Sequence, residues 1–151
     1  MDRSSKKIPQ QSEDKDWEIS VYLTSLEDYP PVIKRSRLRP DIVLHSAVTK
    51  EMILVELTVP YESRMEEAHI FKTEKYSDLK KDLTRQGYKT KIFAVEVGAR
   101  GFAGTSVYEL LRYLNVSSKT RNKAMKALSE TAEKSSHWIW VRRNDRKLQK
   151  E

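Results

Sequence analysis

The stretch DIVLHSAVTKEMILVELTV, residues 41–59, decides the fold of this chain. It holds two apolar runs, residues 41–46 and 52–59, separated by the short polar segment 47–51, and this pattern predicts a β-hairpin. Aliphatic and β-branched residues fill both faces of the second run, which predicts a central strand of a sheet. Pro60 ends that strand because proline has no backbone N–H to donate to a neighbour.

The segment before the hairpin predicts another strand. Trp17, Ile19, Val21 and Leu23 alternate with more polar residues, which is the period-two pattern of a strand with one buried face. We expect this apolar set to face the core. Prolines and basic side chains then fill residues 29–40, which predicts an irregular basic connection.

The sequence after the hairpin predicts three helices and a further strand. Residues 62–86 carry a helical apolar stripe, and Gly87 is suited to end that helix. Residues 91–97 predict a strand, and residues 105–114 and 117–134 predict two helices. This order of elements predicts an α/β fold with a mixed central sheet flanked by helices.

Composition narrows the class of protein. The length of 151 residues suits one domain, which we expect at residues 16–143 between a disordered polar tail, 1–15, and a basic tail, 144–151. The sequence has no cysteine, which excludes disulfides, thiolate metal sites and a cysteine nucleophile and fits a reducing, intracellular location. No apolar run reaches the length of about 20 residues that a membrane span needs, so we expect no membrane partner.

The positive charge is concentrated in the last third of the sequence. Residues 100–151 hold 12 of the 29 basic residues and five of the 22 acidic ones, which accounts for the entire net charge of +7. This excess favours an anionic partner such as DNA. The alternative is a solvated surface whose charge serves solubility.

Two carboxylates of the predicted hairpin carry the chemistry. Asp41 opens one strand and Glu56 lies inside the other, so strand pairing can bring their side chains together. A carboxylate within an apolar run is costly to bury unless it is paired or holds a cation. If Glu56 is unpaired in the absence of metal, Glu56→Ala is expected to stabilise the fold. Oxygen ligands suit Mg²⁺ or Mn²⁺, which can activate a water and stabilise charge on a phosphate. The alternative is that Glu56 faces solvent or pairs with a basic residue of a helix, and that Pro40-Asp41 is an ordinary turn.

Several motifs occur in one order along the chain. They are Arg39-Pro40-Asp41-Ile42-Val43, Val55-Glu56-Leu57-Thr58-Val59-Pro60, Lys72 with Lys75-Tyr76, and Glu96-Val97-Gly98-Ala99-Arg100-Gly101-Phe102. Together they resemble the restriction-like endonuclease domain of non-LTR retrotransposons, a branch of the PD-(D/E)XK superfamily, over residues 17–143. The resemblance implies a restriction-endonuclease-like core that nicks target DNA, with Asp41 and Glu56 as the metal ligands. It also implies a nuclear location and, as partners besides DNA, a reverse transcriptase or a second copy of the chain.

Position 58 departs from the wider superfamily pattern. That pattern has a lysine two residues after the acidic ligand, where this sequence has Thr58. The retrotransposon group is similar to this chain in lacking that lysine and places one on the following helix, where Lys72 and Lys75 stand here. We therefore expect both lysines to be catalytic, since a lysine beside the attacked phosphate can stabilise its growing charge. The alternative for each is a solvated surface lysine.

Further residues are expected around this centre. Thr58, Tyr76 and Glu96 are expected to support the ligands and the lysines. Contacts to DNA are expected from Arg39, Arg100, Lys119, Arg121, Lys123 and Lys126, the last four near a helix N-terminus that favours phosphate.

Two tryptophans near the end of the sequence and three histidines are further candidates. Trp138 and Trp140 can stack on bases, but near a helix end they more often seal the edge of a core. His45, His69 and His137 have no metal-ligand spacing and are expected to be structural.

Two other functions stay open at this point. The missing lysine at position 58 favours a catalytically inactive nuclease-fold module that binds DNA or RNA. A resolvase of branched DNA junctions is the other alternative.

Overall fold

A computed structural model describes residues 16–22 and 29–144. Within them four strands form one sheet in the order β1 (Trp17–Val21), β2 (Ile42–Ser46), β3 (Glu51–Thr58) and β4 (Lys89–Glu96). β2 is antiparallel to both of its neighbours, β1 and β3, and β4 is parallel to β3. The predicted polar tail, residues 1–15, lies outside the described residues, as do Leu23 and residues 145–151.

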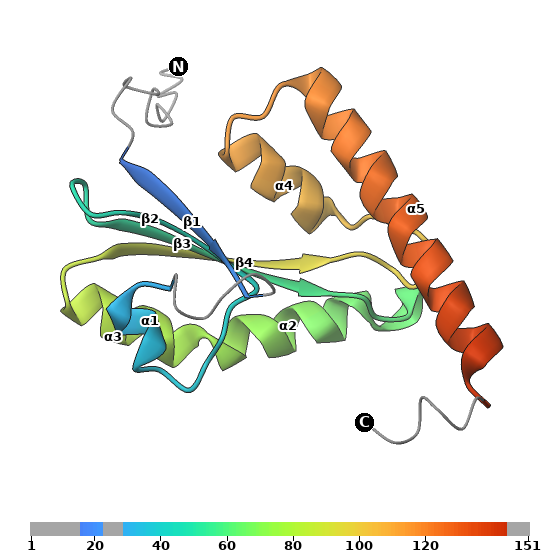
Figure 1. Cartoon of the computed structure of the whole chain (residues 1–151), viewed down its shortest axis with the longest axis horizontal. Helices are drawn as coiled ribbons and strands as arrows, with labels where there is room; N and C mark the ends of the chain where they lie inside the picture. Colours follow the sequence, from blue (N-terminus) through green and yellow to red (C-terminus); the bar gives the residue numbers. More distant parts are fainter. Residues whose placement is uncertain (1–15, 23–28, 145–151) are drawn as a thin grey trace, which may run out of the picture.

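Helices cover both faces of the sheet, as Figure 1 shows. One face packs against α1 (Pro31–Lys34), α2 (Met65–Lys75) and α3 (Ser77–Arg85), and the other against α4 (Thr105–Tyr113) and α5 (Ser118–Arg142). The prediction of an α/β fold with a mixed sheet between helices is therefore confirmed. None of the helices in the described residues combines the length and the apolar character that a membrane crossing requires.

The hairpin forms as predicted, and β3 is the centre of the molecule. Its residues 52–56 are buried without a break, and their side chains alternate between two apolar cores. Met52 and Leu54 pack with Leu79 and Leu83 on one face, and Ile53 and Val55 pack with Val107 and Ala132 on the other. A strand with both faces covered explains why its sequence is apolar at nearly every position.

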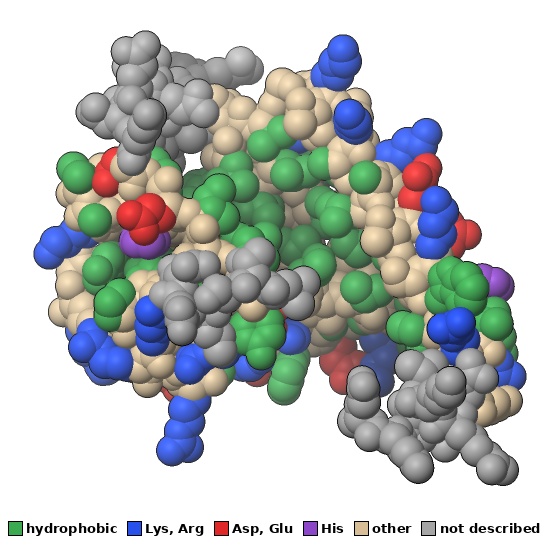
Figure 2. All heavy atoms as spheres, viewed as in Figure 1, with side chains coloured by type: hydrophobic (Ala, Val, Ile, Leu, Met, Phe, Trp, Pro, Cys, Tyr) green, Lys and Arg blue, Asp and Glu red, His purple; other side chains and the backbone are tan. Residues whose placement is uncertain are grey.

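The prediction of the buried face of β1 is wrong. Ile19 is 65% exposed, whereas Ser20 is buried. Ile19 is in register with Leu44 and Ile53, on the face that α4 and α5 cover over β3 and β4 but not over the edge strand β1. Figure 2 shows a hollow lined by hydrophobic side chains between the strands on one side and α4 and α5 on the other.

The single long helix predicted for residues 62–86 is also wrong. A short 3₁₀ turn (Glu62–Arg64) leads into α2, and the helix breaks at Tyr76, whose backbone (φ −97°, ψ 0°) separates α2 from α3. The predicted apolar stripe reaches the core through Tyr76 and α3, where Leu79 and Leu83 are buried, while α2 buries no residue within the described part of the chain. α2 and α3 follow one another along the same face of the sheet (Figure 1).

Two helical segments differ from the predictions. The connection predicted for residues 29–40 contains α1, where Pro31 occupies the first turn and Val32 and Ile33 are buried. The last helix begins at the predicted cap, Ser117, whose hydroxyl accepts the N–H of Thr120, but it continues to Arg142 rather than ending at residue 134. Neither glycine nor proline occurs in those 25 residues to stop it.

Candidate active site

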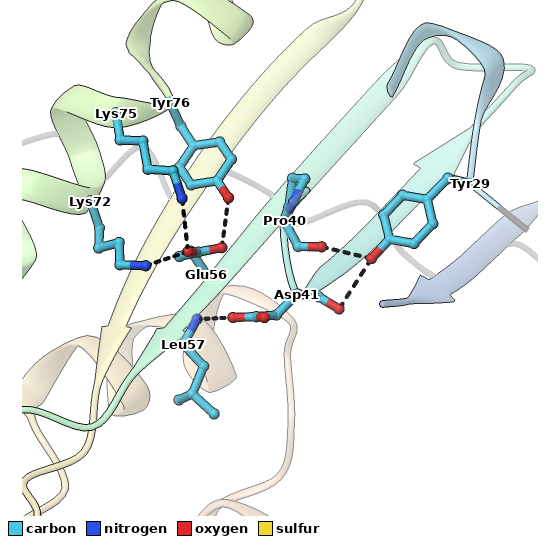
Figure 3. A network of polar contacts seen from close by, with 8 residues as sticks. All are labelled: Tyr29, Pro40, Asp41, Glu56, Leu57, Lys72, Lys75 and Tyr76. Carbon is cyan, nitrogen blue, oxygen red and sulfur yellow. Dashed lines mark hydrogen bonds and ion pairs between the residues drawn. The ribbon is translucent and has the colours of Figure 1, made fainter. Parts of the chain in front are cut away.

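Strand pairing brings the two predicted metal ligands to the same end of the hairpin. Ile42 pairs with Val55, so Asp41, one residue before β2, lies opposite Glu56. β3 continues past this point to Thr58, beyond the start of its neighbour. Figure 3 shows both carboxylates on adjacent strands, with the side chains of α2 above Glu56.

Asp41 is held at the exposed end of this pairing. Its Oδ2 accepts the backbone N–H of Leu57 at 2.7 Å. Burial raises the pKa of the Asp41 carboxyl, the Leu57 N–H opposes this, and the nearby charge of Glu56 adds to it. The hydroxyl of Tyr29 donates to the carbonyl of Pro40 at 2.6 Å, and burial followed by the charge of Asp41 raises the pKa of Tyr29 to about 12. Tyr29 therefore stays protonated and fixes the backbone from which Asp41 projects.

Glu56 is almost fully buried, at 6% exposure, and both of its oxygens have partners. Nζ of Lys72 lies 2.5 Å from Oε1, and Nζ of Lys75 lies 3.6 Å from the same oxygen. The hydroxyl of Tyr76 donates to Oε2 at 2.8 Å (Figure 3). Burial and then this bond hold the pKa of Tyr76 far above its ordinary value, so the phenol keeps its proton and donates this hydrogen bond at all working pH values. A basic residue beside Glu56 was expected both from the resemblance and from the alternative of a helix ion pair.

The three residues expected to support this centre occupy different places. Tyr76 is bonded directly to Glu56. Thr58 lies on the same face of β3, two residues further on, and its buried Oγ1 has no hydrogen-bond partner among the described residues. Glu96 is in register with Thr58 but is bonded elsewhere: Oε1 lies 2.9 Å from Nδ1 of His69, and Oε2 accepts the hydroxyl of Ser106 at 2.7 Å. Glu96 thus fixes α2 and α4 to the sheet.

Two of the arginines expected to contact DNA are engaged by the protein itself. The guanidinium of Arg39 donates to the carbonyls of Ile33, Lys34, Ser36 and Leu38. Arg121 donates to the carbonyl of Val116 and to Ser118, and its guanidinium lies over the ring of Tyr108. Both arginines secure local structure, and a role in DNA binding stays a prediction for each.

The remaining basic residues lie at two separate places. Lys119, Lys123 and Lys126 are exposed on the first turns of α5, at the end of that helix away from the C-terminal ends of β3 and β4 (Figure 1). Arg100 follows β4, and its Nε and backbone N–H donate to Glu62. Arg100 is therefore on the side of the molecule where β3 ends, and the lysines of α5 are not.

The donor set at this centre fits a divalent cation in part. Asp41 and Glu56 offer carboxylate oxygens from adjacent strands, and Mg²⁺ is usually held by one or two carboxylates together with water and substrate phosphate. No group of three or more His, Asp or Glu side chains suited to a metal occurs in residues 16–22 and 29–144. A cation here would take its other ligands from water and substrate.

No protein-family model matches the sequence, and no curated protein is significantly similar to it. The interpretation of this centre therefore depends on the motifs and on the geometry of Asp41, Glu56 and Lys72.

Proposed function

We propose that this chain is a DNA endonuclease with a restriction-endonuclease-like core that uses Mg²⁺ or Mn²⁺. The observation that carries the proposal is the contact of Lys72 with Glu56, two residues 16 positions apart on α2 and β3. It brings a lysine to the acidic strand of a chain that has Thr58 at the position of the superfamily's lysine. Asp41 completes the group from the adjacent strand. As in the family it resembles, the role proposed is nicking of target DNA in the nucleus, with a reverse transcriptase or a second copy as partner.

Each residue of this centre has its own role in the proposed reaction. A cation held by Asp41 and Glu56 would activate water and stabilise the charge of the attacked phosphate. The N–H of Leu57 and the hydroxyl of Tyr76 orient the two carboxylates. Lys72 and Lys75 neutralise Glu56 and offer ammonium groups to the negative charge that develops on the phosphate. Because these donors are fixed before the substrate arrives, they need little reorganisation during the reaction.

The test is incubation of supercoiled plasmid with the protein and Mg²⁺ or Mn²⁺, beside a sample with chelator. We expect nicked circles with either metal and none with chelator. Asp41→Asn keeps the size of the side chain and should abolish nicking, with DNA affinity in a gel shift within a few-fold of wild type. Asp78→Asn, at an exposed position of α3, is the matched control and should nick normally. Intact plasmid after incubation with wild type and either metal would overturn the proposal.

A binding module that does not cut is the second candidate. The observation that favours it is that both oxygens of Glu56 are occupied by Lys72 and Tyr76. Such a module should bind DNA or RNA equally well in chelator and in Mg²⁺, and Glu56→Gln should leave that affinity unchanged.

A further inference from the structure

A groove of about 1020 Å³ lies at the C-terminal end of α5. One wall is the last turns of that helix, and the other is formed by the segments that follow β3 and β4. Its aromatic and basic lining comprises Tyr61, Arg100, Lys134, Trp138, Trp140 and Arg143. Figure 2 shows hydrophobic and basic side chains next to one another over this end of α5. None of the expected DNA contacts except Arg100 belongs to this lining.

The aromatic rings of the groove are exposed rather than packed. Trp138 and Trp140 are 60% and 61% exposed, and Tyr61 is 68% exposed. The expectation that the two tryptophans seal a core edge is therefore wrong, because α5 carries them past the sheet (Figure 1). Large rings gathered on a surface indicate a binding site rather than a core.

Positive charge is fixed beside each tryptophan. The guanidinium of Arg143 lies 3.8 Å from the ring centroid of Trp140, and that of Arg142 lies 5.2 Å from the ring of Trp138. Arg143 and Lys134 belong to the lining itself, where Glu133 contributes one acidic group and Arg100 is paired with Glu62. The groove thus combines flat apolar faces with a net positive charge.

The groove adjoins the proposed cleavage centre. Val59, which lines the groove, follows the end of β3 and is three residues after Glu56. Three residues of extended chain span about 10 Å. That span is about three stacked nucleotides at 3.4 Å each. Asp41 is bonded to Leu57, two residues before Val59. The groove and the two carboxylates therefore lie at the same end of the sheet, where β3 ends.

We propose that this groove binds unpaired nucleotides of the DNA on one side of the cleavage position. Bases inside a duplex stack on one another and present no face to a tryptophan, whereas unpaired bases stack on aromatic side chains and leave their phosphates to arginine and lysine. The inference rests on the proposed nuclease function and adds the class of substrate: DNA with a bubble, flap, junction or single-stranded end.

The test measures binding in chelator, so that it does not depend on cleavage. Fluorescence anisotropy compares a labelled single strand with a duplex of the same length. Wild type should bind the single strand more tightly, and Trp138→Ala and Trp140→Ala should each weaken that binding about tenfold while duplex affinity changes less. Trp138→Phe and Trp140→Phe keep an aromatic face and should restore most of the affinity. Trp17→Ala, on the edge strand β1, is the control of the same residue type and should have no effect.

The outcomes separate this proposal from the nuclease. Single-strand binding that depends on both tryptophans, in a protein that never nicks plasmid, would support the groove and overturn the nuclease. Nicking by wild type, with single-strand affinity unchanged in both alanine variants, would overturn the groove alone. Sedimentation of the same variants gives a further check: loss of a dimer with unchanged affinity for DNA would mean that the groove is a contact between copies, and would also overturn the proposal.

Discussion

Nζ of Lys72 lies 2.5 Å from Oε1 of Glu56, although the first residue belongs to a helix and the second to the central strand. In the function proposed here, α2 supplies the lysine that the wider nuclease pattern takes from the same strand as the acid.

Lys72→Ala should lower the rate of plasmid nicking by about a hundredfold, the scale found when one preorganised donor is removed. Lys75→Ala should cost less, since its nitrogen is 3.6 Å from the same oxygen. DNA affinity, measured by gel shift, should change little. Lys80→Ala, on the exposed side of α3, is the control and should stay within about threefold of wild type. If the two variants matched Lys80→Ala while Asp41→Asn was inactive, another group must supply the charge.

Tyr76→Phe should destabilise the fold by about 1.5–3 kcal/mol, because it removes a hydrogen bond between a buried phenol and a carboxylate. Urea unfolding followed by circular dichroism measures the loss. Tyr88→Phe, at a partly buried position after α3, is the comparison. Equal stability of the two variants would show that the bond to Glu56 contributes nothing.

The contacts of Glu56 also reverse an expectation from the sequence. An unpaired carboxylate in this strand would make Glu56→Ala stabilising, but Glu56 is bonded to Lys72 and Tyr76. Glu56→Ala should therefore destabilise, by at least about 1–3 kcal/mol, because it leaves a buried hydroxyl without a partner. Glu56→Gln, which retains an acceptor for Tyr76, should cost less in the same unfolding experiment.

Asp41 should make stability depend on pH. Its pKa is raised in the folded protein, mainly by burial, so the folded state binds the proton more tightly than the unfolded state does. The contribution of Asp41 to stability should fall as pH rises from the ordinary value of 3.8 through the raised one. Asp41→Asn carries no charge, so it should be more stable than wild type at pH 7 and lose that advantage below about pH 3.8. Denaturant titrations at both pH values test this, with Asp78→Asn as the exposed control.

Gly101→Ala should destabilise more than Gly87→Ala. Both glycines have a positive φ, 92° and 87°, so an alanine at either costs roughly 1–2 kcal/mol. A Cβ on Gly101 would in addition lie 2.9 Å from the carbonyl oxygen of Ser129 in α5, whereas Gly87 faces open space. Thermal unfolding of both variants isolates the contact, which should add about 1 kcal/mol or more.

The sequence predicted the elements whose pattern is local and missed those set by packing. The hairpin of β2 and β3 follows from apolar periodicity, and so does its pairing of Asp41 with Glu56. The break at Tyr76 does not, because the apolar stripe continues across it, although the hydroxyl of that residue is bonded to a distant strand. The exposure of Ile19 depends on where α4 and α5 lie. The alternation of apolar and polar residues in β1 carries no information about the position of those helices.

The candidate site shows the same division. Motif order predicted Asp41, Glu56 and Lys72, and the structure brings the last two into contact. Arg39 and Arg121 are basic in sequence, but their neighbours in space are backbone carbonyls. The sequence did not predict the exposed end of α5, because the helix was expected to end at residue 134 and tryptophans near a helix end usually pack against a core. The absence of glycine and proline from residues 118–142 was the available signal.

The helix that carries both lysines is the part of the site least anchored to the core. α2 buries no residue within the described part of the chain, whereas β3 buries five in succession. Segments with few buried contacts open locally at a lower free energy than the whole molecule. Backbone amides of α2 should therefore exchange with deuterated water well before those of β3. On gentle heating the protein should cease to cut while its sheet is still intact, and cooling should restore cutting at once, without refolding.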